Sequence, residues 1–178
     1  MAKTCVTEKT ADRQRWIENG LLTLMLQKQY SRISVTDLCS HLQLPRRSFY
    51  RYFNDLDDVL NSLMEHTFQQ LVLVPREPSV QDLQRGYEFW LERRDLLDAL
   101  YHGGLMEKLF EFTLRYTGFH NANAAANGPE PQKDTQLFII SGFVSLIISW
   151  YSDGFQKTPE QMARISHKML YEPFLKKH

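Results

Sequence analysis

The chain has 178 residues, of which 43% are hydrophobic and 24% are charged, so it is long enough for one large domain or two small ones with a substantial core. The 21 Lys and Arg residues balance the 21 Asp and Glu residues, which excludes a molecule that binds polyanions through its net charge alone. Two cysteines imply no disulfide framework, and the first residues lack the apolar segment of a secretory signal, so we expect a cytoplasmic protein.

Residues 12–29 have the spacing of an amphipathic helix. Apolar side chains such as Ile17 and Leu21 recur on one face, and charged residues such as Glu18 lie mostly on the other side. Gly20 lies inside this segment, where it costs about 1 kcal/mol of helix propensity relative to alanine. We therefore expect another helix to cross close to Gly20.

Two short helices are expected next, separated by a turn before Pro45. Hydroxyl residues and Asp37 favour a helix start near Ser34, and Pro45 suits the opening of the following helix, which runs to Phe53. In that helix Phe49 and Phe53 are four residues apart and point inward. The other side chains form an exposed basic and aromatic face: Arg46, Arg47, Ser48, Tyr50, Arg51 and Tyr52.

This exposed face has the chemistry of a DNA-reading helix. Guanidiniums suit phosphate oxygens and the O6/N7 edge of guanine, and the second helix of a helix-turn-helix enters the major groove with its first residues toward the bases. The residues through Asn54 contain nine Lys and Arg against four Asp and Glu, a surplus of five, so the basic part of the chain coincides with this motif.

The residues of this segment resemble the TetR family of transcriptional regulators. The matching positions are Ile17, Leu21, Leu22, Leu24, Met25, Tyr30, Val35, Asp37, Leu38, Phe49, Tyr50, Tyr52 and Phe53. The resemblance implies that Thr36 and Tyr50 contact phosphates and that residues 46–48 read bases. The predicted DNA-binding residues are Ser34, Thr36, Arg46, Arg47, Ser48, Tyr50, Arg51 and Tyr52.

Three positions depart from the family pattern. Gln43 stands at the turn position usually held by glycine, where a positive φ would be less comfortable for it. Pro45 replaces the usual serine or threonine cap, and Leu56 replaces a lysine that often contacts the DNA backbone.

Helical patterns continue through the remaining chain. Asn54 or Asp55 can cap a helix that runs to about Val74, and the prolines at 75–78 end it. Helical stretches then begin at Ser79, Leu105, Thr135 and Thr158, whereas residues 120–134 have no amphipathic period and are expected to form a mobile loop. We predict an all-α protein with about nine helices: a helix-turn-helix domain (1–54), a connecting helix (55–74) and a regulatory and dimerisation domain (75–178).

The most apolar run, residues 137–151, is shorter than the roughly 20 residues that a membrane span needs, so we expect a buried helix and no membrane. Its apolar residues surround the helix and present more surface than one neighbouring helix can bury. We therefore expect a second copy of the chain to cover the rest, in a homodimer. The sequence from Leu137 to Leu170 also resembles the final helix pair that forms the dimer interface in many TetR-family members.

Aromatic and apolar residues of the second domain form either an apolar effector pocket or plain core. They are Tyr87, Trp90, Leu91, Tyr101, Met106, Phe110, Phe143, Ile147 and Trp150. We find no metal-ligand spacing, no cofactor motif and no catalytic constellation, so no enzyme is predicted.

Two functional hypotheses follow. In the first, a homodimeric repressor binds a pseudo-palindromic operator in double-stranded DNA and is released by a small apolar or aromatic effector. In the second, a TetR-like interaction protein is controlled by a protein partner instead of a small ligand.

Overall fold

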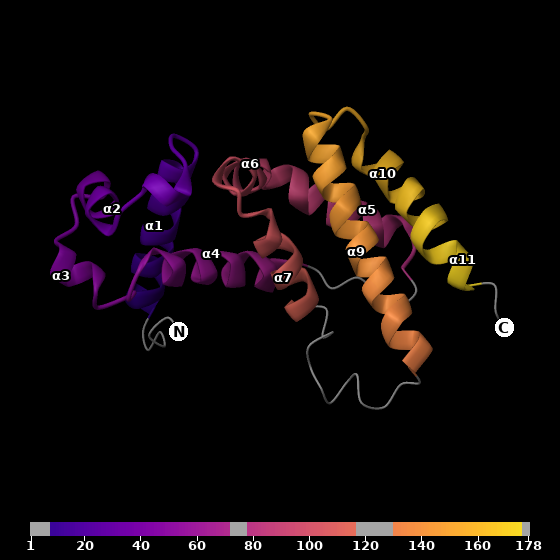
Figure 1. The fold of residues 1–178 in the computed structure, drawn as a ribbon, viewed down its shortest axis with the longest axis horizontal. Coiled ribbons are helices and arrows are strands. Elements are labelled where there is room, and N and C mark those ends of the chain that lie inside the picture. Colours follow the sequence, from indigo (N-terminus) through magenta and orange to yellow (C-terminus); the bar gives the residue numbers. More distant parts are fainter. Residues whose placement is uncertain (1–7, 72–77, 117–129, 176–178) are drawn as a thin grey trace. The chain divides into compact units, whose positions relative to one another are not determined.

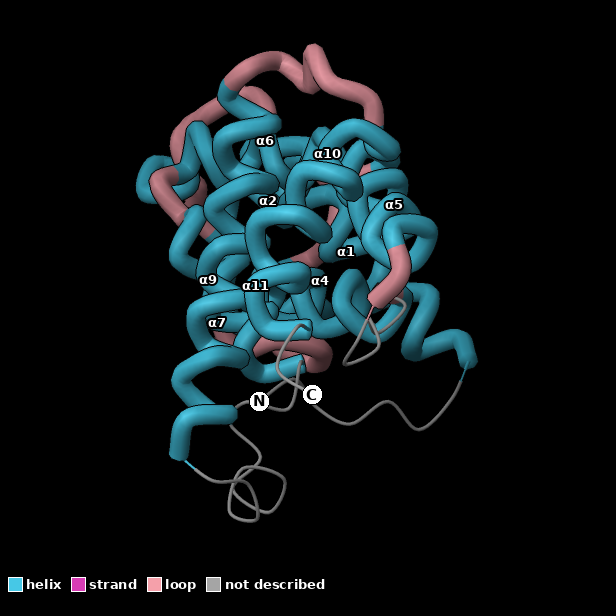
Figure 2. The backbone as a smooth tube through the Cα atoms, turned by 90° about the vertical axis from the view of Figure 1, so that its right-hand side faces the viewer, coloured by secondary structure: helices cyan, strands magenta, loops and turns pink. Residues whose placement is uncertain are grey.

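The computed structural model describes residues 8–71, 78–116 and 130–175. Within these ranges the backbone forms helices, turns and loops and no strand, which confirms the all-α prediction (Figure 2). If the unbroken run from Pro159 to Leu175 is counted as one helix, these ranges contain nine α-helices, as expected. Two compact units are distinguished: the described residues up to Gln69 together with Asp98–Met106, and Gln70–Leu97 together with the described residues from Glu107.

The end of a fifth helix, Asp98–Gly103, belongs to the N-terminal unit, whose other elements are four α-helices and one 3-10 turn (Figure 1). These elements are α1 (Glu8–Met25), η1 (Tyr30–Arg32), α2 (Val35–His41), α3 (Arg46–Phe49) and α4 (Leu56–Gln70). Their fully buried side chains meet in one apolar core, to which α1 contributes Ile17 and Leu21, α2 contributes Leu38, and α3 contributes Phe49. The three-helix unit that the sequence predicts is therefore present.

The bounds of α1 and α3 differ from the expected ones. The first helix begins at Glu8 and ends at Met25, before the expected end, because a tight turn closes there with the N–H of Lys28 donating to Leu24. Helix α3 ends at Phe49, before the expected end at Phe53, and hydrogen-bonded turns carry the chain on to Phe53. The spacing of apolar residues does not reveal where either helix ends, because an apolar side chain can stay buried when its residue lies in the turn that follows the helix.

Gly20 lies against the end of the second helix. A Cβ atom at this position would lie 2.6 Å from Cδ2 of Leu42, which caps α2. This confirms the close approach predicted from the glycine, since any larger residue would have to displace Leu42.

Glu18 does not lie on the solvent face as expected. Its side chain is buried and accepts hydrogen bonds from the Ser62 hydroxyl over 2.6 Å and from Nδ1 of His66 over 2.9 Å. Because both partners lie on α4, a polar contact joins α1 to α4 inside the unit.

The C-terminal unit contains α5 (Val80–Glu92), the first residues of α6 (Arg94–Gly103), α7 (Met106–Tyr116) without its first residue, and the last helices of the chain. The last helices are α9 (Glu130–Ser152), α10 (Pro159–Ser166), the π-helical turn η2 (His167–Tyr171) and α11 (Glu172–Leu175). Helix α10 packs on α5, and α9 packs on α10 and η2 (Figure 1).

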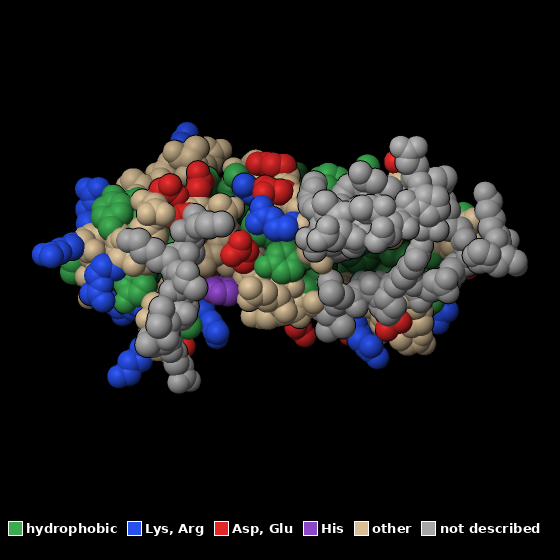
Figure 3. Space-filling model, turned by 90° about the horizontal axis from the view of Figure 1, so that it is seen from below, with side chains coloured by type: hydrophobic (Ala, Val, Ile, Leu, Met, Phe, Trp, Pro, Cys, Tyr) green, Lys and Arg blue, Asp and Glu red, His purple; other side chains and the backbone are tan. Residues whose placement is uncertain are grey.

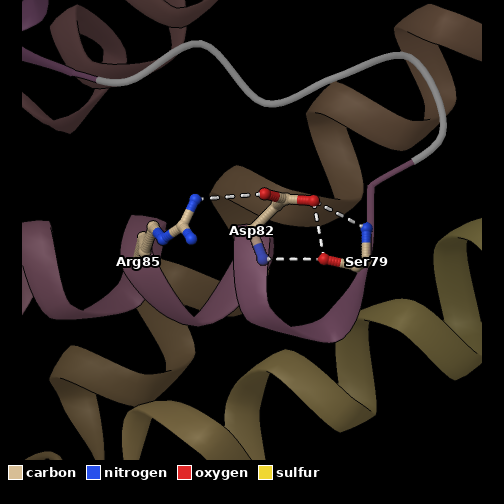
Figure 4. Close-up of polar contacts among 3 residues, drawn as sticks. All are labelled: Ser79, Asp82 and Arg85. Carbon is tan, nitrogen blue, oxygen red and sulfur yellow. Dashed lines mark hydrogen bonds and ion pairs between the residues drawn. The ribbon is translucent and has the colours of Figure 1, made fainter.

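Ser79 and Thr158 start α5 and α10, as predicted, and each belongs to a capping box. Ser79 accepts a hydrogen bond from the backbone N–H of Asp82 over 3.2 Å, and the Asp82 carboxylate accepts one in return from the N–H of Ser79 (Figure 4). Arg85 forms an ion pair with the same carboxylate at 3.3 Å. Thr158 and Gln161 form the corresponding box for α10, with Pro159 in its first turn.

Helix α9 is longer and more exposed than expected. It begins at Glu130, so residues 130–134 were wrongly predicted as loop; residues 117–129 lie outside the described residues. An acidic residue followed by a proline suits a helix start even where no amphipathic period is visible. By length and composition alone Asp134–Ser152 could cross a membrane, and 17% of that window is buried within this chain. The prediction of a buried helix therefore fails for the single chain.

Candidate nucleic-acid interface

The start of α2 is fixed by Ser34 and Asp37. The Ser34 hydroxyl accepts a hydrogen bond from the N–H of Asp37, and the Asp37 carboxylate accepts bonds from the hydroxyl and the N–H of Ser34. These bonds, together with the ion pair to Lys28 at 3.2 Å, lower the pKa of Asp37 to about 2. Thr36, one residue earlier, is exposed. The predicted contact residue Ser34 therefore already uses its hydroxyl in the cap.

The turn between α2 and α3 is centred on Gln43, whose φ is +50°. The N–H of Leu44 donates to the carbonyl of Cys39 over 2.8 Å, and the N–H of Gln43 donates to that of Ser40 over 3.2 Å. This is the Schellman arrangement, in which the residue with positive φ is usually glycine. The glycine expected from the family pattern is thus missing at a position where the backbone does have a positive φ.

Helix α3 is held by its inward side. Phe49 and Phe53 are fully buried, with ring centroids 6.1 Å apart. On the outward side Arg46 and Arg47 are exposed, and Ser48 is half-buried. The residues predicted to read bases therefore start a short helix that is anchored from behind.

Arg46 and Tyr50 lie one turn apart and contact each other. Nη2 of Arg46 donates a hydrogen bond to the Tyr50 hydroxyl over 3.2 Å, and this bond raises the pKa of Arg46. The next pair, Arg51 and Tyr52, also lies close, with the guanidinium 5.7 Å from the ring centroid. Arg46, Tyr50 and Arg51 are exposed, and Tyr52 is half-buried.

Basic side chains gather around these elements. Figure 3 shows Lys and Arg side chains standing out on the N-terminal unit at the end where α2 and α3 lie. Cys39, on α2, is buried, and burial raises the pKa of its thiol, as expected for packing rather than reactivity. Among the described residues no group of His, Cys, Asp and Glu side chains is arranged to hold a metal ion.

The predicted effector-pocket residues fall into two groups. In the C-terminal unit, Tyr87, Trp90, Ile147 and Trp150 are buried, whereas Leu91, Phe110 and Phe143 are half-buried. In the N-terminal unit, Tyr101 is exposed and Met106 is half-buried.

An aromatic cluster joins part of the first group. The ring of Tyr87 lies 5.2 Å from that of Phe143 and 5.3 Å from that of Trp150. The Tyr87 hydroxyl is hydrogen-bonded to the buried Ser166 on α10. Ser166 is not among the predicted residues, because a lone serine on a helix carries no signal of its long-range partner.

Comparisons with known proteins agree with this architecture. Residues 81–172, about half of the chain, match a family model described as the C-terminal region of transcriptional regulators, TetR_C_8. A curated relative, the HTH-type dhaKLM operon transcriptional activator DhaS of Lactococcus lactis, is 29% identical over 72 residues. That match spans 40% of this chain and 35%, about a third, of the relative's length.

Two solved structures share the fold. The dihydroxyacetone kinase operon activator DhaS superposes with a TM-score of 0.56 at 15% identity, over 88% of this chain and 93% of that one. A structure described as a TetR-family transcriptional regulator, from Syntrophomonas wolfei, superposes with a TM-score of 0.58 at 18% identity, over 89% and 92% of the two chains.

Proposed function

Because this chain belongs to the TetR family of transcriptional regulators and is not an enzyme, we propose that it binds a pseudo-palindromic DNA operator as a homodimer, with α3 in the major groove. The observation that carries the proposal is the pair of exposed guanidiniums, Arg46 and Arg47, on a helix anchored by the buried Phe49 and Phe53. Such a helix can enter a groove without losing its packing.

The predicted contact residues divide by the chemistry they offer. Arg46, Arg47 and Ser48 reach base edges, and Thr36 and Tyr50 contact phosphates. Ser34, Arg51 and Tyr52 flank this surface. In this proposal residues 1–54 bind DNA, residues 55–74 connect, and residues 75–178 regulate and dimerise.

A second copy is proposed to cover the apolar surface of α9. Val144, Ile147 and Trp150 of this helix are buried within the chain, whereas Phe138 is 58% exposed. Since 17% of the apolar window Asp134–Ser152 is buried within the chain, much of this apolar helix is accessible, as is typical of interfaces. A two-fold axis there would present two α3 helices to successive major grooves.

The regulator is proposed to act in the cytoplasm as a repressor that a small apolar or aromatic effector releases. The cluster of Tyr87, Phe143 and Trp150 supports an aromatic ligand, since its rings offer edge and face contacts. The relative from Lactococcus lactis is named an activator. Reporter transcription from the selected operator, measured with and without the regulator, decides the sign.

Control by a protein partner is the alternative. The burial of four predicted pocket residues favours it. Tyr87, Trp90, Ile147 and Trp150 are each at most 1% exposed, so an effector would have to displace core side chains. A rise in Tm together with operator release on titration with aromatic small molecules supports the effector. Release only by a protein that binds the regulator supports the alternative.

The test of DNA binding is selection of bound sequences from a random duplex pool at stated salt, with the stoichiometry of the winning complex measured alongside. We expect an inverted repeat bound by two copies. A folded protein that enriches no sequence would contradict the proposal.

Arginine variants test whether α3 contacts the bases of the operator. Arg46→Ala or Arg47→Ala should weaken binding to the selected site by roughly 1–3 kcal/mol for each lost bidentate base contact. Arg94→Ala is the matched control, because Arg94 is an arginine whose side chain is 73% exposed in the other unit. Binding that both reading-helix variants leave unchanged would remove α3 from the interface.

A further inference from the structure

The contact between Arg46 and Tyr50 links two side chains to which the family resemblance gives separate tasks. Besides the hydrogen bond of 3.2 Å, the guanidinium carbon lies 5.9 Å from the centre of the Tyr50 ring. Positions four residues apart share one side of a helical turn, so the two side chains leave the backbone in the same direction. Both side chains are exposed.

Tyr50 is itself held in place. Its ring meets the ring of Phe49 edge to face, with centroids 5.3 Å apart and planes at 84°. Phe49 is fully buried. The exposed hydroxyl is therefore carried by a ring that rests on the core, and the guanidinium it binds is restrained from the same side.

Arg47 provides the contrast within the same turn. It is exposed like Arg46, but no described residue binds its guanidinium. A long side chain loses rotamer freedom when it is ordered on binding, and one restrained in advance loses less. Of the two adjacent arginines, only Arg46 has this advantage among the described contacts.

The hydrogen bond leaves Arg46 able to recognise a base. A guanidinium has five N–H donors, and Tyr50 accepts one from Nη2. The remaining donors still include a pair on neighbouring nitrogens, as needed for the O6/N7 edge of guanine. Tyr50 can thus restrain the arginine without occupying its recognition edge.

We propose that Tyr50 is a positioning residue that presents Arg46 to one base pair of the operator, so that its hydroxyl contributes to sequence discrimination. The inference rests on the proposed DNA-binding function and goes beyond it. A tyrosine that only contacts phosphate lowers affinity for every sequence equally, whereas a positioning tyrosine changes the preference at one base pair.

The first experiment uses the full chain and the selected operator with its single-base variants at one salt concentration. Arg46→Ala identifies the base pair at which discrimination is lost. Tyr50→Phe keeps the ring and removes the hydroxyl, and should reduce discrimination at that same base pair roughly 2- to 10-fold, the cost of ordering one side chain. In the Arg46→Ala background, Tyr50→Phe should change discrimination no further.

Two matched variants complete the design. Tyr116→Phe removes the hydroxyl of a half-buried tyrosine of α7 in the other unit, outside the predicted contact residues, and should leave the preference at that base pair unchanged. Arg47→Ala should combine additively with Tyr50→Phe. An equal loss on all duplexes, with discrimination retained, would overturn the inference while leaving specific DNA binding intact.

The second experiment needs no DNA and separates this inference from the proposed function. NMR of the arginine side chains in the free protein should show slower guanidinium rotation for Arg46 than for Arg47, and Tyr50→Phe should abolish the difference. Equal rotation of the two guanidiniums would overturn the inference, whatever the DNA selection finds.

Discussion

The carboxylate of Glu18 on α1 accepts a hydrogen bond from the Ser62 hydroxyl on α4 over 2.6 Å, and both side chains are buried. His66 lies one turn further along α4 and reaches the second carboxylate oxygen at 2.9 Å. Since α1 also packs on α2, this contact ties α4 to the two helices that precede it in the N-terminal core.

Replacing Glu18 by alanine should therefore destabilise the N-terminal unit. The change leaves the buried Ser62 hydroxyl without its acceptor, and an unsatisfied buried polar group costs roughly 1–3 kcal/mol. We expect a loss of this size in the free energy of unfolding, measured by urea denaturation of the full chain.

Two variants separate the polar contact from helix propensity. Glu18→Gln keeps an oxygen acceptor and should recover part of the loss. Asp12→Ala changes an exposed acid of the same helix and should have little effect. If Glu18→Ala is as stable as the wild type, the contact contributes nothing to folding.

Gln43→Gly should stabilise the protein. At φ +50° an L side chain costs roughly 1–2 kcal/mol in close contacts, and glycine avoids them. The greater freedom of glycine in the unfolded chain offsets part of this gain. We expect a net increase in the free energy of unfolding of about 0.5–1 kcal/mol, by the same denaturation measurement.

Two glycines of the chain that have a positive φ serve as references for the Gln43→Gly substitution. Gly104 and Gly154 end α6 and α9 with φ of +69° and +67°, and a Cβ at either would meet nothing within 4 Å. Gly104→Ala and Gly154→Ala should each destabilise, purely through the backbone. A Gln43→Gly protein less stable than the wild type would show that the glutamine side chain makes a compensating contact.

Much of the fold follows from local signals in the sequence. The spacing of Phe49 and Phe53 predicts two buried anchors, and Ser79 and Thr158 predict helix starts that the capping boxes confirm. These features depend on residues within one or two turns, so a single sequence contains all the information they need.

The remaining features depend on partners distant in the chain. Glu18 and Ser62 are 44 residues apart, and no helical periodicity reveals that a charged residue turns inward. The sequence does not distinguish a pocket from a core for a related reason, since aromatic residues such as Tyr87 and Trp150 occur in both. The DNA-contact and pocket assignments therefore remain predictions.

The α2 capping box should depend on pH. The pKa of Asp37 in the folded chain is about 2, below its ordinary value of 3.8, so its contribution to stability is complete above about pH 4 and is lost as the pH falls toward 2. Asp37→Asn should lower Tm above pH 4, and the difference from the wild type should shrink as the pH falls to 2.

The α10 box is the matched control, because Gln161 takes the place of the acid there and does not titrate. Gln161→Ala should lower Tm by an amount that does not change with pH. A difference between Asp37→Asn and the wild type that stays constant from pH 6 to pH 2 would show that the charge of Asp37 is not what stabilises the cap.

Phe138→Asp should disrupt the proposed dimer. Phe138 is 58% exposed on α9, and a second copy packed there would bury a carboxylate without a partner, which is unfavourable. We expect light scattering to give the mass of one chain for the variant and of two for the wild type, with helical content unchanged. Tyr101→Asp, at a position 48% exposed in the other unit, should remain dimeric.

If α9 forms the interface, the Phe138 variant should also lose tight binding to the inverted repeat yet discriminate the same bases in a half-site, because α3 is unchanged. A Phe138→Asp protein that stays dimeric would move the interface away from this part of α9.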